Sequence, residues 1–196
     1  MKKFFLLLVL SLGSIGLAFA QANPALLQSH LDRYFLATQA KDWKTVLDMV
    51  HPKVFSLAPR EMMEQMYSQM EKESGMRFDF GEITILHFKA ELVHSDTVYI
   101  PVDYAMTLEI HLNPTLFSSD KQIQQLFEAF QLAYSGQQIS FDEAQNRFTI
   151  NLKNTLIAST KKDSNHWYFG EYKANDPLTR LIFPDAVLDR LREGWN

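Results

Sequence analysis

The 196-residue sequence contains no cysteine, so it offers no disulfide, no thiolate metal site and no cysteine-linked lipid anchor. It has no HExxH motif, and its six histidines are not grouped at the spacings typical of a metal site. Its seven glycines are scattered, so no glycine-rich loop is available to hold a phosphate, and no GxSxG nucleophile motif occurs. We therefore expect no metal and no cofactor, and no motif marks a catalytic residue.

Basic residues are too few and too dispersed to form a nucleic-acid-binding stripe. The chain has 19 Lys and Arg against 23 Asp and Glu, a net charge of −4. A protein that binds nucleic acid usually concentrates positive charge on one face or helix. The charge balance thus argues against a nucleic-acid partner and indicates little beyond solubility.

The only long apolar run lies at the N-terminus. It follows Lys2 and Lys3, extends over about 17 residues and ends in Ala18-Phe19-Ala20, the small-residue pattern of a secretory cleavage site. A membrane anchor is the alternative, but the run is at the lower limit for a spanning helix, and polar residues follow it. We predict a signal peptide over residues 1–20, cleavage after Ala20, and a secreted or periplasmic protein with no membrane segment after cleavage.

The remaining residues, 21–196, are enough for one domain with a sizeable core. Losing Lys2 and Lys3 leaves 17 Lys and Arg against 23 Asp and Glu, a net charge of −6. The order of patterns is helices, strands, a helical insertion over 113–147, strands, and a helical tail over 177–196. This order predicts an α+β fold rather than an alternating βαβ chain.

Three helices are predicted before the first strand. The first runs from about Pro24 to Ala40, the second starts at the N-cap residue Asp42, and the third follows Pro59 and ends at Gly75. The third helix carries an apolar stripe of methionines with Tyr67, which we interpret as core rather than as an adaptable binding surface. A capping box of Ser119 and Gln122 predicts a further helix inside the insertion.

One long strand is predicted from residue 97 to 112, because every even position there is apolar and most odd positions are not. The even face should therefore form the core, which places Asp103, Glu109 and His111 on the outer face. Leu86 and Phe88 are predicted to share the core face of a partner strand, and Pro101 suggests an edge position or an outward-pointing site.

A hairpin is predicted from about Phe148 to Tyr172, turning at the polar residues 161–165. In its second strand Trp167 and Phe169 should face the core, with Glu171 near the strand end. Whether the tail covers the opposite face, which carries Tyr168 and Tyr172, stays open.

The segment from Leu31 to Phe55 resembles the N-terminal pattern of the nuclear transport factor 2-like superfamily. The resemblance rests on aromatic residues in the first helix, small residues after them, the Asp42-Trp43 turn, and Phe55 after Pro52; Trp167 is similar to the closing strand of that family. It implies a cone, in which a strongly curved mixed or antiparallel sheet wraps the N-terminal helices around a cavity. The insertion and the C-terminal helix depart from the simplest members.

The resemblance implies that aromatic and methionine side chains line this cavity. The candidates are Tyr34, Phe35, Met66, Tyr67, Tyr104, Met106, Trp167 and Phe169. Since the fold does not settle function, three interpretations remain. The first is a non-catalytic exported domain that binds an apolar small molecule or a protein partner. The second is an isomerase, dehydratase or cyclase, which needs an acid or histidine within hydrogen-bond reach of Tyr34 or Tyr104. The third is a homodimer formed through the open sheet face around Tyr99 and Ala105.

Overall fold

The computed structural model describes residues 24–174 and 176–195. The predicted signal peptide lies outside the described residues. Four helical elements come first: α1 (Pro24–Gln39), α2 (Trp43–Met49), the 3-10 helix η1 (Pro52–Ser56) and α3 (Arg60–Ser74). Their ends follow the predicted signals. The Asp42 side chain accepts a hydrogen bond from the Thr45 backbone NH, and Gly75 ends α3 in the left-handed conformation at φ 69°.

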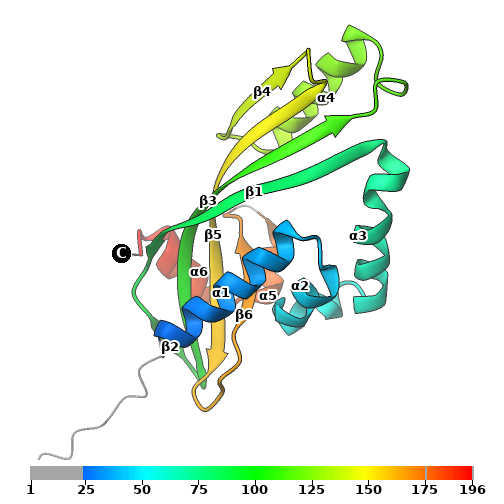
Figure 1. The fold of residues 1–196 in the computed structure, drawn as a ribbon. Helices are drawn as coiled ribbons and strands as arrows, with labels where there is room; N and C mark the ends of the chain where they lie inside the picture. Colours follow the sequence, from blue (N-terminus) through cyan, green and yellow to red (C-terminus); the bar gives the residue numbers. More distant parts are fainter. Residues whose placement is uncertain (1–23, 175, 196) are drawn as a thin grey trace, which may run out of the picture.

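The strands form one open sheet of six strands (Figure 1). They are β1 (Met76–Phe88), β2 (Leu92–His94), β3 (Thr97–Leu112), β4 (Gln138–Asp142), β5 (Arg147–Lys161) and β6 (Tyr168–Tyr172). The main order is β1-β3-β5-β4, β2 pairs with β3, β6 pairs with β5, and all these pairs are antiparallel. The remaining helices are α4 (Asp120–Ala133), α5 (Pro177–Ile182) and α6 (Asp185–Arg192). The predicted α+β class and the 148–172 hairpin are confirmed.

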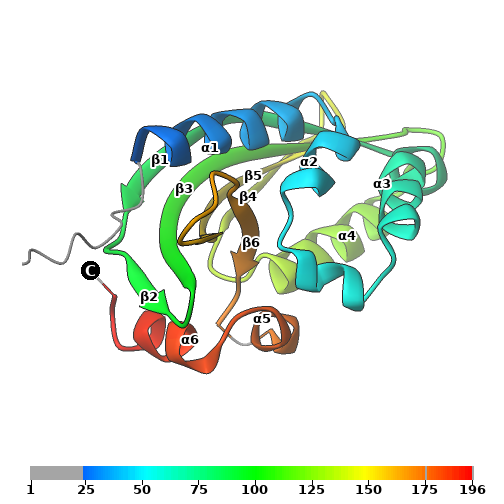
Figure 2. The ribbon, with the colours of Figure 1, turned by 90° about the horizontal axis from the view of Figure 1, so that it is seen from below.

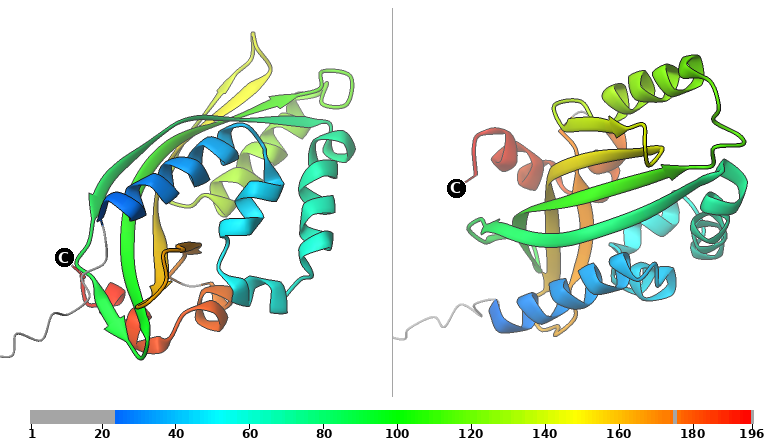
Figure 3. Two further views of the ribbon diagram at one scale, coloured as in Figure 1. Left: turned by 60° about the horizontal axis from the view of Figure 1, so that its bottom comes forward. Right: turned by 45° about the horizontal axis from the view of Figure 1, so that its top comes forward.

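Alternation along β3 sets the two faces of the sheet. Its even residues are the apolar ones, and Val102 and Ile110 are fully buried, so the predicted core face is confirmed. We call this the α1 face, because Leu27, Leu31 and Phe35 of α1 pack against it. Farther along the same face, α4 covers Leu108, Ile110 and the β5 residues Phe148 and Ile150. Figure 3 shows α4 and α6 on separate parts of the sheet.

The C-terminal helices cover the opposite face of the sheet (Figure 2). Phe183, Val187 and Leu188 pack with Tyr99 and Ile157 from the odd positions of β3 and β5. Gly170 on β6 permits this contact, because a Cβ atom there would lie 2.7 Å from the Phe183 ring. The tail therefore covers the β6 face that the sequence left open. The tail also buries Tyr99, one of the two residues of the predicted dimer interface. A dimer through this face would therefore have to use the region around Ala105.

The partner strand of β3 differs from its predicted phase. An irregularity between Phe80 and Ile83 shifts the register, so Ile83 and Ile85 pack against the α1-face core. Leu86 is 53% exposed and Phe88 is 38% exposed. A second irregularity between Ile85 and His87 places Phe88 opposite Val102 on the core face and leaves Leu86 outside the register, so the prediction that both residues face the core is wrong for Leu86 and not for Phe88.

Pro101 does not lie on an edge strand. It sits in β3 between β1 and β5, opposite Ile157, and is buried. The pairing of β3 with β1 ends at Val102, and its pairing with β2 starts at Tyr99. Pro101 thus falls in the gap between the two neighbours, where its carbonyl accepts a hydrogen bond from Lys89 and an NH is not needed.

Two further features differ from the sequence prediction. The 113–147 insertion is not purely helical, because β4 adds a short edge strand to the sheet within it. The methionine stripe of α3 is not core: α3 has no buried residue, and Met62 is 59% exposed. Among the described residues no helix is long and apolar enough to cross a membrane.

Candidate functional site

A tyrosine and a glutamate meet on the α1 face through a contact that spans three strands. Tyr104 of β3 lies opposite Asn154 of β5, and Glu171 of β6 lies opposite Leu156 of β5. The Tyr104 hydroxyl reaches over β5 and donates a hydrogen bond to Glu171 Oε1 at 2.5 Å. This is the acid within hydrogen-bond reach of a tyrosine that the enzyme interpretation requires.

Helix α1 places two more aromatic rings beside this pair. The Phe35 ring lies 5.4 Å from that of Tyr104, and the Tyr34 ring lies 5.0 Å from that of Phe169. Burial raises the pKa of the Tyr34 hydroxyl, and the negative charge of Glu171 adds to the rise. Tyr34, Tyr104 and Glu171 therefore interact within a mostly apolar surrounding.

Glu171 is the most perturbed acid of the site. Burial raises the pKa of its carboxyl from 4.5 to about 7, although the hydrogen bond from Tyr104 acts in the opposite direction. Oε1 accepts that bond, whereas Oε2 is buried and has no hydrogen-bond partner. As whole residues Glu171 and Tyr34 are half-buried.

Tyr104 is held as a neutral hydroxyl. Burial raises its pKa well above 10, and the nearby carboxylate of Glu171 reinforces the rise, whereas a hydrogen bond with Asn154 opposes it. A neutral hydroxyl at this position can donate to Glu171 throughout the physiological pH range. Tyr104 and Glu171 are therefore a stable donor–acceptor pair, in which Glu171 Oε2 makes no hydrogen bond.

The structure places the other predicted cavity residues at different depths. Four candidates are buried in the α1-face core: Phe35, Tyr104, Trp167 and Phe169. Tyr34 and Met106 pack against it as half-buried residues. Tyr67 is half-buried and its ring stacks on Trp43 at 5.0 Å. Met66 is 54% exposed, so it does not contribute to this core.

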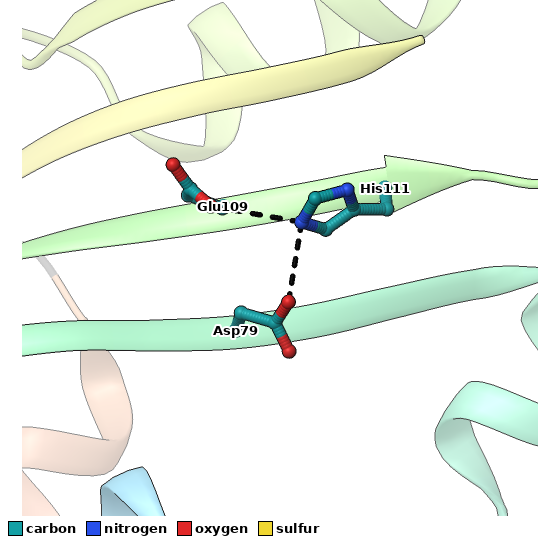
Figure 4. Close-up of side chains that lie close together, drawn as sticks. All are labelled: Asp79, Glu109 and His111. Atoms are coloured by element: carbon teal, nitrogen blue, oxygen red, sulfur yellow. Dashed lines mark ion pairs between the residues drawn. The ribbon is translucent and has the colours of Figure 1, made fainter. Parts of the chain in front are cut away.

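A second cluster of titratable groups lies on the opposite side of the sheet, where Asp79 of β1 faces Glu109 and His111 of β3 (Figure 4). His111 Nε2 lies 3.1 Å from Asp79 Oδ2 and 3.6 Å from Glu109 Oε2. This confirms that Glu109 and His111 lie away from the core face. It also brings together three possible metal ligands that sequence spacing alone did not group.

The carboxylates of this cluster already have cationic partners. Arg77 pairs with Asp79 at 3.0 Å, and Arg147 pairs with Glu109 at 2.8 Å. Lys41 adds a third positive charge at 3.5 Å from Asp79 Oδ1. A metal ion would have to compete with these groups, so we interpret the cluster as an ion-pair network that joins β1, β3 and β5.

Sequence reasoning missed Glu171 as a site residue although a signal was present. Trp167, Phe169 and Glu171 share one phase of a strand, so the expectation that the two aromatic residues face the core applies equally to Glu171. The missing information was the neighbour across the sheet, since Tyr104 is 67 positions away in the sequence.

The comparisons with known proteins add no relative to this picture. No family model matches the chain, and neither a curated protein nor a solved structure matches it.

Proposed function

We propose that this protein is an exported, non-catalytic domain that binds a small and largely apolar molecule on the α1 face. Glu171 and Tyr104 supply the polar contacts, and Tyr34 and Phe35 of α1 flank them. The observation that carries the proposal is Glu171 Oε2, which is buried without a hydrogen-bond partner.

An unpaired buried polar atom is costly, typically about 1–3 kcal/mol, so proteins rarely keep one without a use. A ligand with one hydrogen-bonding group would complete the partners of Glu171, and the aromatic side chains around it would contact an apolar ligand body. The nuclear transport factor 2-like resemblance supports the same proposal, because members of that superfamily bind ligands in the corresponding cavity. The predicted export signal agrees with a ligand met outside the cytoplasm.

A screen by native mass spectrometry and thermal shift tests this proposal. The chain from Gln21 onward would be exposed to lipid-like and aromatic metabolites, and we expect at least one to bind and raise the melting temperature. Glu171→Gln and Tyr104→Phe should each lower the affinity for that ligand about tenfold, which is the effect of losing one good hydrogen bond. Glu91→Gln, which changes an exposed acid between β1 and β2, is the matched control and should bind normally. Binding that ignores both site variants, or no binder at all, would refute the proposal.

A second candidate is an acid–base enzyme of the isomerase, dehydratase or cyclase type. The pKa of Glu171 favours it, because a value of about 7 suits proton transfer near neutral pH. In that case the bound ligand would be converted, and mass spectrometry of the reaction mixture would detect the product. Glu171→Gln would abolish turnover while Tyr104→Phe slowed it. A ligand recovered unchanged after long incubation with the protein would leave binding as the function.

A further inference from the structure

The 113–147 insertion forms a pocket of its own, far from Glu171 in the sequence. The pocket has a volume of about 560 Å³ and lies between the start of α4, the loop before it and the turn from β4 to β5. That volume is within the range of small-molecule sites. We call it the insertion pocket.

Six of the ten residues that line the insertion pocket are polar; the other four are apolar, and we call these four its floor. They are Phe117, Ile123, Phe127 and Phe141, and all four pack against the buried cluster around Phe148. The ring of Phe148 lies 6.1 Å from that of Phe127 and 4.6 Å from that of Phe141. These contacts fix the two rings in place, so the pocket floor is preformed.

Two acidic side chains stand at the rim of this floor. Asp120 begins α4, Glu143 follows β4, and both are exposed. Within residues 24–174 and 176–195 the structure gives neither carboxylate a cationic partner. Arg147, the nearby arginine of β5, is bound to Glu109 at 2.8 Å. The rim therefore carries negative charge that the described side chains do not balance.

The first turn of α4 begins with a capping box. Ser119 accepts a hydrogen bond from the Gln122 backbone NH, and the Gln122 side chain accepts one from the Ser119 backbone NH. This capping box satisfies two backbone donors at the start of the helix. The carboxylates of Asp120 and Glu143 favour a cation in this pocket.

We propose that the insertion pocket binds an ammonium group carried on an apolar body about the size of one aromatic ring. The ammonium lies between Asp120 and Glu143, and the body contacts the rings of Phe127 and Phe141. Aromatic faces also attract cations, which adds to the charge complementarity. The ammonium belongs either to a free amine or to a lysine side chain of a protein.

Ligand-detected NMR and calorimetry on the chain from Gln21 onward test this proposal. The probes are 2-phenylethylamine, its neutral analogue 2-phenylethanol, and the peptide N-acetyl-Phe-Lys amide. We expect the amine or the peptide to bind, and the neutral analogue to bind at least about fivefold more weakly, since two exposed charge pairs are lost. A preference for the free amine identifies a small-molecule site, and a preference for the peptide identifies a site for a protein lysine. Raising the salt concentration should weaken the binding of the amine and leave the binding of the alcohol unchanged.

The double variant Asp120→Asn/Glu143→Gln should remove the preference for the amine over the alcohol. Asp163→Asn, an exposed acid in the turn between β5 and β6, is the matched control and should retain it. Equal binding of amine and alcohol by the unmodified protein would overturn the proposal. So would an unchanged preference in the double variant, or a failure of both cationic probes to bind at 10 mM.

Discussion

Replacement of Glu171 by glutamine should make the folded protein more stable at alkaline pH. The glutamine amide oxygen can accept the same hydrogen bond from Tyr104, but the side chain stays neutral at every pH. The native carboxyl must ionise in a buried position, which costs free energy. This cost raises its pKa from 4.5 to about 7. The variant removes this cost and leaves the packing nearly unchanged.

The sign and size follow from proton linkage. Between pH 4.5 and 7 the folded protein holds the Glu171 proton more tightly than the unfolded chain, so the free energy of unfolding decreases as pH rises. A pKa difference of this size corresponds to about 3 kcal/mol when the whole interval is crossed. From pH 5 to pH 8 the advantage of Glu171→Gln should therefore grow by about 2–3 kcal/mol. At the upper pH this amounts to a melting temperature roughly 5–10 °C higher for a domain of this size.

Urea unfolding followed by tryptophan fluorescence at pH 5, 6, 7 and 8 measures this difference. Comparing each variant with the unmodified chain at the same pH cancels the titration of every other group. Glu82→Gln changes an exposed acid and should show no trend over the same range. A stability difference between Glu171→Gln and the native chain that does not change with pH would show that Glu171 is not held at a raised pKa.

Three further predictions concern the surrounding fold. Gly170→Ala should cost about 1–3 kcal/mol of stability in urea unfolding, because the new methyl group meets the Phe183 ring at 2.7 Å; an unchanged midpoint would contradict that packing. Burial lowers the pKa of His51 to about 4, so the stability that its neutral form provides above pH 6.5 is lost as pH falls through 4. His51→Asn, which can still accept the hydrogen bond of the Lys53 NH, should flatten that loss, and an unchanged acid slope would refute the assignment. Zn²⁺ should leave the melting temperature unaltered, because cations already pair with Asp79 and Glu109; a saturable shift that His111→Ala removes would establish a metal site instead.

Alternation predicted β3 because that strand runs for 16 residues and keeps one phase throughout. The same rule failed for β1, where irregularities after Phe80 and after Ile85 shift the phase, so that Ile83 and Ile85 face the core and Leu86 is exposed. It missed β4 because five residues on a sheet edge give too short a pattern to separate from a loop. The alternation of apolar and polar residues thus predicted the long regular strand β3. It failed for β1, which contains bulges, and for β4, which is a short edge strand.

The methionine stripe of α3 shows a different limit. Helical spacing correctly predicted the helix, but it cannot say whether another element covers the stripe. In the structure Tyr67 stacks on Trp43, whereas Met62 and Met66 stay more than half exposed. Coverage is a property of the tertiary arrangement, which the sequence of one helix does not contain.

Glu171 is the residue at which local pattern and stability disagree. The phase set by Trp167 and Phe169 directs its side chain to the apolar α1 face, where a neutral side chain would be more stable at neutral pH. Its hydrogen bond with Tyr104 satisfies only one carboxyl oxygen, so the fold does not compensate the burial fully. Sequences that specify a fold usually agree with it at every level, and exceptions concentrate where function requires them. If Glu171→Gln proves more stable above pH 7, the native acid is maintained there at a cost to the fold, which is the pattern expected of a ligand-binding or catalytic group.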